Sequence, residues 1–172
     1  MRIVGGKFAG RRLEPPNDSR VRPTAESVRD AVLTALGPHL TGARILDLFA
    51  GTGALGLEAL SRGAKTADFV EIRPSSLHAL RANVALLRMR ERTRIFKRDA
   101  LPFAAALEEG SYEIAFVDPP YDSKMLDRVI EGWLAKPFSR ILVAEHTAAH
   151  VLPAPAKRRL YEETAISFYG TL

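Results

Sequence analysis

Short apolar stretches recur along the middle of the chain and alternate with longer segments whose apolar positions return every three to four residues. The short runs predict buried strands, and the helical spacing predicts amphipathic helices. Strands are expected at 44–49, 66–71, 93–98, 112–118 and 140–145, and helices at 53–62, 74–88, 101–109 and 123–135. This alternation predicts an α/β fold with a doubly wound, mostly parallel sheet that carries helices on both faces.

The two ends of the chain do not continue this alternation of strands and helices. Residues 1–23 look like a basic appendage in which 2–4 and 11–13 pair as a hairpin, before Pro15 and Pro16 break regular structure. Thr24 is a fair N-cap for a helix that runs to Leu36. Residues 159–164 and 165–169 are expected to form a closing antiparallel hairpin, which brings the sheet to seven strands.

The bulk composition suits one globular domain over residues 1–172, with an arm at 1–23 and a core at 24–172. The chain has 47% hydrophobic and 26% charged residues, and it contains no cysteine, which excludes disulfides and thiolate metal sites. No apolar run reaches the length of a membrane-spanning helix, so no membrane partner is expected. The first residues lack the apolar stretch of a signal peptide, which predicts a cytoplasmic protein.

The charge is basic, with a net value of +5 and a pI near 9.8. Basic domains tend to bind polyanions, although this signal is weak on its own. Arginines and lysines gather in the first 22 residues and again over 88–98. The second cluster is more typical of a solvated face than of an RNA track.

A glycine-rich loop follows the first predicted strand. Gly51 to Gly56 match the spacing G-x-G-x-x-G, and Glu71 stands where a ribose-binding acid is expected. A tight turn without a ligand is the alternative, and a nicotinamide dinucleotide is a rival cofactor. Asp47 at the strand end would repel pyrophosphate but suits a cationic amino-acid group. The loop therefore favours S-adenosylmethionine.

Asp99 follows the third predicted strand, next to the second in a doubly wound sheet. It could accept a hydrogen bond from an adenine amino group, or it could be the N-cap of the next helix. With Glu71 and Asp47 in place, the ligand role is favoured.

Asp118, Pro119, Pro120 and Tyr121 follow the apolar strand Ile114–Val117 and are expected to carry the chemistry. A purine amine is a poor nucleophile because its lone pair is delocalised. A carboxylate and a backbone carbonyl would orient that lone pair, the prolines would restrict the loop, and Tyr121 would stack on the base. A polar turn is the alternative.

Two other sequence features are weaker indications of a functional site. His146 and His150 have helical zinc spacing, but they follow a predicted strand and the nearby Glu145 precedes the pair, so no metal is expected. Trp133, the only tryptophan, is expected to anchor the core.

Together, Asp47–Gly56, Glu71, Asp99 and Asp118–Tyr121 resemble class I (Rossmann-like) S-adenosylmethionine-dependent N-methyltransferases. Residues 2–6, 10–13, 22–24 and 28–29, with 47–64, resemble more narrowly the bacterial 16S ribosomal RNA guanine-N2 methyltransferases of the D type. The resemblance implies cofactor contacts from Asp47, Phe49, Gly51, Gly53, Glu71, Ile72, Asp99 and Ala100, and catalytic roles for Asp118, Pro119, Pro120 and Tyr121.

The same resemblance implies one guanine of 16S rRNA as the substrate, presented in the 30S subunit or an assembly intermediate. Arg11, Arg12, Arg22 and Thr24 are the expected RNA contacts, and a solvated arm is the alternative. The protein is expected to act as a monomer without a metal. An adenine-N6 methyltransferase, a nicotinamide-dependent oxidoreductase and a non-catalytic RNA-binding protein remain open.

Overall fold

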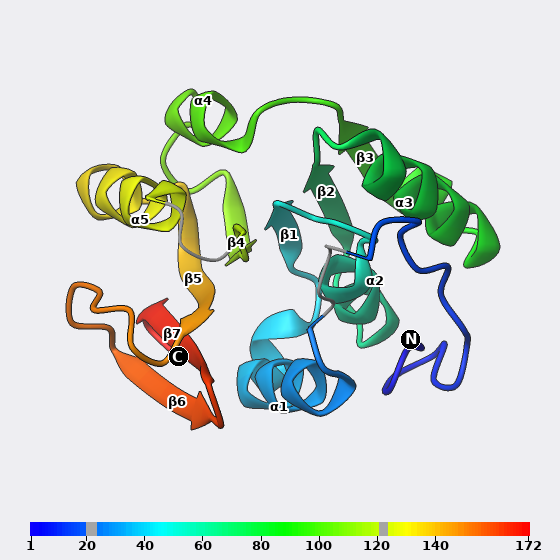
Figure 1. The fold of residues 1–172 in the computed structure, drawn as a ribbon, viewed down its shortest axis with the longest axis horizontal. Helices are drawn as coiled ribbons and strands as arrows, with labels where there is room; N and C mark the ends of the chain where they lie inside the picture. The colour runs from blue at the N-terminus through cyan, green and yellow to red at the C-terminus, as the bar shows by residue number, and fades with distance from the viewer. Residues whose placement is uncertain (20–23, 121–123) are drawn as a thin grey trace.

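A seven-stranded sheet forms the centre of the computed structural model, which describes residues 1–19, 24–120 and 124–172 (Figure 1). Its strand order is β3-β2-β1-β4-β5-β7-β6. The strands are β1 Arg44–Leu48, β2 Thr66–Val70, β3 Thr93–Phe96, β4 Tyr112–Val117, β5 Ser139–Thr147, β6 Lys157–Tyr161 and β7 Thr164–Gly170. The first five pair in parallel, whereas β7 runs antiparallel to β5 and β6 antiparallel to β7. The predicted doubly wound sheet and its closing hairpin are confirmed.

Helices cover both faces of this sheet (Figure 1). They are α1 Glu26–Leu36, α2 Ala54–Ser61, α3 Pro74–Leu86, α4 Ala100–Ala105 and α5 Met125–Ala135, with 3-10 turns at Gly37–Leu40 and Arg90–Arg92. The first three pack on one face, and α4 and α5 pack on the other. Among the described residues, none of the helices is both long and apolar enough to cross a bilayer.

Each central strand contributes to two hydrophobic cores because successive side chains point to opposite faces. In β4, Ile114 and Phe116 join the core under α1–α3, whereas Ala115 and Val117 join the core under α4 and α5. Strands that are covered on both sides need apolar residues throughout, which is why this stretch has no hydrophobic alternation. Trp133 lies in the second core, and its Nε1 donates to the Ser139 carbonyl at 3.0 Å, as expected of a core anchor.

Several predicted boundaries shift. The first helix begins at Glu26 with Ala25 at its N-cap, so the prediction that Thr24 caps it was wrong. The helix predicted at 101–109 covers only Ala100–Ala105, whereas β5 extends beyond its predicted range to Thr147. Residue 123, the predicted start of the fifth helix, lies outside the described residues.

The N-terminal arm pairs as predicted but is part of the fold. Arg2 and Arg12 form an antiparallel bridge, and the Ile3 amide donates to the Arg11 carbonyl at 2.8 Å. Ile3 is fully buried and Leu13 is 5% exposed, both in the core under α1–α3. Burial of these side chains holds the arm against the body, so it is not a loose appendage.

A buried acid on α2 fastens the arm. The Glu58 carboxylate accepts hydrogen bonds from the amides of Val4 and Gly5 at 3.0 and 2.8 Å. It also accepts from Arg29 Nε of α1 at 2.7 Å, with both side chains fully buried. An ion pair of this kind is costly to break from one side, since the remaining charge would be buried alone. Glu58 therefore joins the arm, α1 and α2.

Candidate active site

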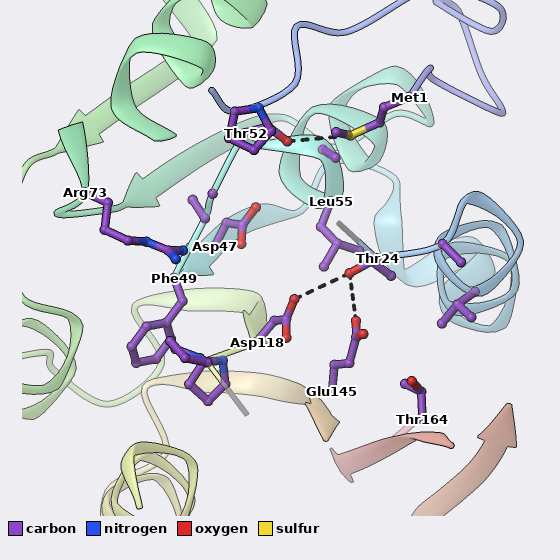
Figure 2. Close-up of a pocket in the computed structure, with 18 residues that line it drawn as sticks. Met1, Thr24, Asp47, Phe49, Thr52, Leu55, Arg73, Asp118, Glu145 and Thr164 are labelled. Atoms are coloured by element: carbon purple, nitrogen blue, oxygen red, sulfur yellow. Dashed lines mark hydrogen bonds between the residues drawn. The ribbon is translucent and has the colours of Figure 1, made fainter. Parts of the chain in front are cut away.

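The sheet reverses its winding between β1 and β4, and a cavity of about 410 Å³ opens at the carboxyl ends of these strands. Ligands of open α/β sheets bind at such a switch point. Figure 2 shows the lining side chains, which come from the arm, α1, the glycine loop and the ends of β1, β4 and β5. The lining includes the predicted site residues Thr24, Asp47, Phe49, Gly51, Asp118, Pro119 and Pro120.

The loop after β1 has an unusual backbone. Phe49, Gly51 and Gly53 have φ angles of 59°, 57° and 81°, in the left-handed region that glycine tolerates and that a bulky side chain such as phenylalanine rarely adopts. Gly56 serves another purpose, because a Cβ there would lie 2.5 Å from the Phe69 ring. This glycine lets α2 approach β2 closely, and the glycine loop between β1 and α2 lines the cavity.

Asp47 is the most deeply buried carboxyl group that lines the cavity. It is 2% exposed, and its Oδ2 accepts a hydrogen bond from the Gly56 amide at 3.0 Å. Burial raises the pKa of Asp47 to about 8, and the nearby Glu71 adds to this rise, against the lowering effect of the Gly56 hydrogen bond. A cation placed in the cavity would favour the ionised form.

Glu71 joins the glycine loop to the loop after β2. One carboxylate oxygen accepts from the Gly51 amide at 2.8 Å, and the other accepts from the amides of Ile72 and Arg73, each at 2.9 Å. Glu71 is buried and does not line the cavity. Its contact with a ribose stays a prediction. The sequence did not indicate that Glu71 would hold the two loops together through their backbone amides.

Asp99 acts as the N-cap of α4, because its Oδ1 accepts from the Leu101 amide at 3.1 Å. This is the alternative that the sequence left open. Ile72 is 54% exposed and Ala100 is buried, and neither lines the cavity; nor does Gly53. The adenine contact of Asp99 and the cofactor contacts of Gly53, Ile72 and Ala100 stay predictions.

Asp118 stands at the end of β4 with Pro119 and Pro120, and all three line the cavity. Burial raises the pKa of Asp118 well above its usual range, and the neighbouring Glu145 and Asp47 raise it further. The Thr24 hydroxyl lies 3.4 Å from Asp118 Oδ2. Tyr121 lies outside the described residues, so its stacking role stays a prediction.

Two side chains at the site were not predicted from the sequence. Glu145 of β5 lines the cavity and accepts a hydrogen bond from Thr24 Oγ1 at 2.8 Å (Figure 2). Its position at the end of the strand beside β4 was a usable signal, but it was considered only as a neighbour of the histidine pair. Asn83 of α3 is fully buried and donates to the carbonyls of Glu14 and Thr52 at 3.1 and 3.0 Å. It links the arm to the glycine loop.

The expected RNA contacts fall into two groups. Arg11 and Arg12 are exposed on the arm, and Arg22 lies outside the described residues. Thr24 sits inside the cavity at the two acids. In the second basic cluster, Arg94 forms an ion pair with Asp68 at 2.6 Å. That arginine has a structural partner already, although its side chain remains largely exposed.

The histidine pair has its own partners. His146 Nε2 lies 2.8 Å from Ser167 Oγ, and His150 Nε2 lies 2.9 Å from Asp127 Oδ1. Within residues 1–19, 24–120 and 124–172, no three histidine or acidic side chains gather in a way that could hold a metal.

The charges of the cavity suit a cationic ligand better than a phosphate. Asp47, Asp118 and Glu145 line it. Among the described residues its one lining cationic side chain is that of Arg73, whose Nε lies 3.4 Å from Glu71. Pyrophosphate would meet three carboxyl groups here, whereas an ammonium and a sulfonium would be attracted to them. The residues therefore fit S-adenosylmethionine, and the glycine loop allows its close approach.

Comparisons with known proteins give a consistent result. A family model described as Conserved hypothetical protein 95 matches residues 1–169. The ribosomal RNA small subunit methyltransferase D of Escherichia coli (strain K12) is 36% identical over 170 residues, which are 95% of this chain and 83% of that protein.

Solved structures agree. A hypothetical protein of Thermus thermophilus has a TM-score of 0.85 and 32% identity, over 99% of both chains. An RNA methyltransferase of Salinibacter ruber in complex with S-adenosyl-L-homocysteine has a TM-score of 0.68 over 86% of this chain and 92% of that one; at 15% identity, it shows the fold alone. These likenesses confirm the predicted fold class.

Proposed function

We propose, since this chain belongs to the Conserved hypothetical protein 95 family, that it methylates the exocyclic N2 of a guanine in 16S rRNA. The chain is an S-adenosylmethionine-dependent rRNA methyltransferase, like its relative in Escherichia coli. This membership confirms the resemblance to the D-type enzymes and sets aside the nicotinamide-dependent and non-catalytic alternatives. The guanine N2 atom is the finer step that needs an experiment.

One observation carries the proposal: a single cavity joins the glycine loop and Asp47 to Asp118, Pro119 and Pro120. The first group suits the methyl donor, and the second suits a planar amine. Asp47 and Asp118 come from β1 and β4, which are neighbours in the sheet. Donor and acceptor can therefore meet without a large movement of the protein, which is the main requirement for a transfer that depends on positioning.

S-adenosylmethionine supplies a methyl group on a positively charged sulfur. Asp118 accepts one N–H of the amine and turns its lone pair towards that methyl. As the new N–C bond forms and the C–S bond breaks, positive charge passes to the nitrogen, and the nearby carboxylate stabilises it. The methylated amine is then strongly acidic because its positive charge lies on a nitrogen attached to the ring, and it gives its proton to the Asp118 carboxylate.

The RNA partner is proposed to be 16S rRNA in the 30S subunit or an assembly intermediate, bound by a monomer in the cytoplasm. Arg11 and Arg12 are exposed on the docked arm, whose Met1 and Pro16 line the cavity. This places the two arginines on the segment that borders the site. With Arg22, they are the proposed phosphate contacts, since arginine binds phosphate readily.

The test is methyl transfer to small subunits from a strain that lacks this enzyme. Tritiated S-adenosylmethionine is the donor, and the labelled RNA is digested to nucleosides and separated. Label in N2-methylguanosine supports the proposal. Label in N6-methyladenosine contradicts it and favours the adenine alternative instead.

A further inference from the structure

Glu145 lies beside Asp118 at the edge of the sheet. The parallel register pairs Val117 of β4 with Ala144 of β5, so the next residues of the two strands, Asp118 and Glu145, are neighbours. Both belong to the face that carries Ile114, Phe116, Ile141 and Val143, because side chains alternate along a strand. Glu145 is 8% exposed and lines the same cavity as Asp118.

Thr24 fixes the relative position of the two acids. Its hydroxyl donates to Glu145 Oε2 at 2.8 Å and lies 3.4 Å from Asp118 Oδ2. Figure 2 shows Thr24 pointing toward both acids. A hydroxyl has a single hydrogen, so the shorter contact is the donated one. Glu145 thus accepts a hydrogen bond from Thr24, and its carboxyl group borders the cavity.

Two adjacent carboxylates match the hydrogen-bonding edge of guanine. Guanine presents two donors side by side, N1–H and the N2 amine. Adenine presents a donor amine beside N1, which is an acceptor. A carboxylate accepts a hydrogen bond from the first edge but repels the ring nitrogen of the second, because an ionised acid has only acceptor sites.

We infer that Glu145 accepts the N1–H of the target guanine while Asp118 accepts an N–H of its N2 amine. This inference rests on the proposed guanine-N2 function and names the residue that makes it selective. Asp118 alone would suit any purine amine. The second carboxylate excludes bases that carry an acceptor beside the reacting amine, as pairing of side chains to base edges does elsewhere.

The base analogue 2-aminopurine isolates this contact. It keeps the amine that receives the methyl group but lacks N1–H, and its N1 is an acceptor. Small subunits are reconstituted with ligated 16S rRNA that carries either guanine or 2-aminopurine at the methylated position. The natural enzyme should methylate guanine at least about fivefold faster, which is the low end of what one good base contact contributes.

The decisive variant is Glu145→Gln. The amide removes the negative charge of the carboxylate and adds an N–H donor, which a carboxylate lacks. It should therefore accept N1–H of guanine less well, and it can donate to N1 of 2-aminopurine. The rate on guanine should fall and the rate on 2-aminopurine should not, so the preference should shrink by about tenfold or more. 2-Aminopurine also lacks O6, but this difference affects both enzymes alike. It therefore cancels when the guanine preference of the variant is divided by that of the natural enzyme.

Glu108→Gln, at an acid whose side chain is 89% exposed, is the matched control and should keep the natural preference. Affinity for S-adenosylhomocysteine and the fluorescence change of 2-aminopurine particles on binding show that each variant is folded and binds. Equal losses on both bases in Glu145→Gln would overturn the inference, as would a natural enzyme that does not prefer guanine. Label in N6-methyladenosine would instead show that the proposed function itself had failed.

Discussion

Asp47, Asp118 and Glu145 place three carboxyl groups around one cavity at the ends of neighbouring strands. Such a cluster is unfavourable without a ligand, because burial and mutual repulsion oppose ionisation. The raised pKa values of Asp47 and Asp118 show the cost. A cationic cofactor and a base edge rich in donors would relieve it. At the scale of single residues, the site is therefore complementary to its ligands rather than to water.

The titration of Asp47 predicts how cofactor affinity depends on pH. With a pKa of about 8, Asp47 of the ligand-free protein holds a proton at neutral pH, and a cationic ligand must displace it. Affinity for S-adenosylhomocysteine, which keeps the ammonium group, should rise between pH 6 and 8 by up to about tenfold per unit. Calorimetry in buffers of different ionisation enthalpy should detect the released proton. A flat profile in the natural protein would contradict this.

Asp47→Asn is the control for that profile, since an amide has the same shape and does not titrate in this range. It should bind more weakly, and its affinity should lose most of the pH dependence. The effect on stability has the opposite sign. Because folding raises the pKa of Asp47 above its unfolded value, its contribution to stability is present at low pH and is lost as pH rises through about 8. The ligand-free variant should lack this loss.

Asp118 and Tyr121 should separate in kinetics. Asp118→Ala removes a contact that strengthens as the amine becomes positive, so the single-turnover rate of methyl transfer should fall by about 10² or more. Tyr121→Phe keeps a stacking face and should lose little, whereas Tyr121→Ala should lose considerably more. Rates on 30S particles at saturating cofactor measure all three. A natural rate in Asp118→Ala would remove that residue from the mechanism.

At the scale of elements, the site depends on close packing between helices and sheet. Gly56 brings α2 against Phe69 of β2, and Asn83 of α3 holds both the Thr52 carbonyl and the arm at Glu14. The glycine pattern marked Gly56, but the sequence was interpreted only as a cofactor loop, so its contact with Phe69 was not predicted. The second could not be, because an asparagine inside a helix has no local signature, and its partners lie 31 and 69 residues away in the sequence.

Two glycine substitutions should have opposite effects on stability. A Cβ at Gly56 would lie 2.5 Å from the Phe69 ring and 3.2 Å from Asp47 Oδ2, whereas a Cβ at Gly132 of α5 would meet nothing within 4 Å. Gly56→Ala should destabilise by about 1–3 kcal/mol through overpacking. Gly132→Ala should stabilise by about 0.5–1 kcal/mol through helix propensity. Urea unfolding measures both, and a neutral Gly56→Ala would show that the ring can move aside.

Asn83→Leu should loosen the arm. It removes the two hydrogen bonds donated by Nδ2 and the one that Oδ1 accepts from the Glu14 amide, and it leaves a buried carbonyl unpaired. The expected loss of unfolding free energy is about 1–3 kcal/mol, with faster proteolysis of residues 1–19. Arg81→Ala, at an exposed position of the same helix, should change stability by less than about 0.5 kcal/mol. Equal protease resistance would mean that the core contacts of Ile3 and Leu13 suffice.

At the scale of the whole molecule, the sheet and its cavity followed from the sequence because their signals are local. Apolar runs mark covered strands, and glycines and acids at strand ends mark the switch point. The docking of the arm was not foreseen, since it depends on long-range contacts from Ile3, Leu13 and Glu58. Thr24 shows the same limit. Its local pattern suggested a helix cap, whereas tertiary packing takes its hydroxyl to Glu145.

The chain has a net charge of +5, and the position of the docked arm predicts which of its charges determine the salt dependence of RNA binding. If Arg11 and Arg12 bind phosphates at the site, replacing both with alanine should weaken binding to 30S particles and flatten its salt dependence. Each lost contact should remove about 0.7–0.9 from the slope of log affinity against log salt, and Arg22→Ala should remove a similar amount. Lys65 and Arg90 are also exposed, but they precede β2 and β3, at the amino ends of the strands and away from the cavity. Their double alanine variant loses the same charge and should keep the slope, because only charges near the bound RNA release counterions.

Cofactor affinity should stay the same in both double variants. Equal slopes in the two would mean that the arm arginines act through overall charge alone.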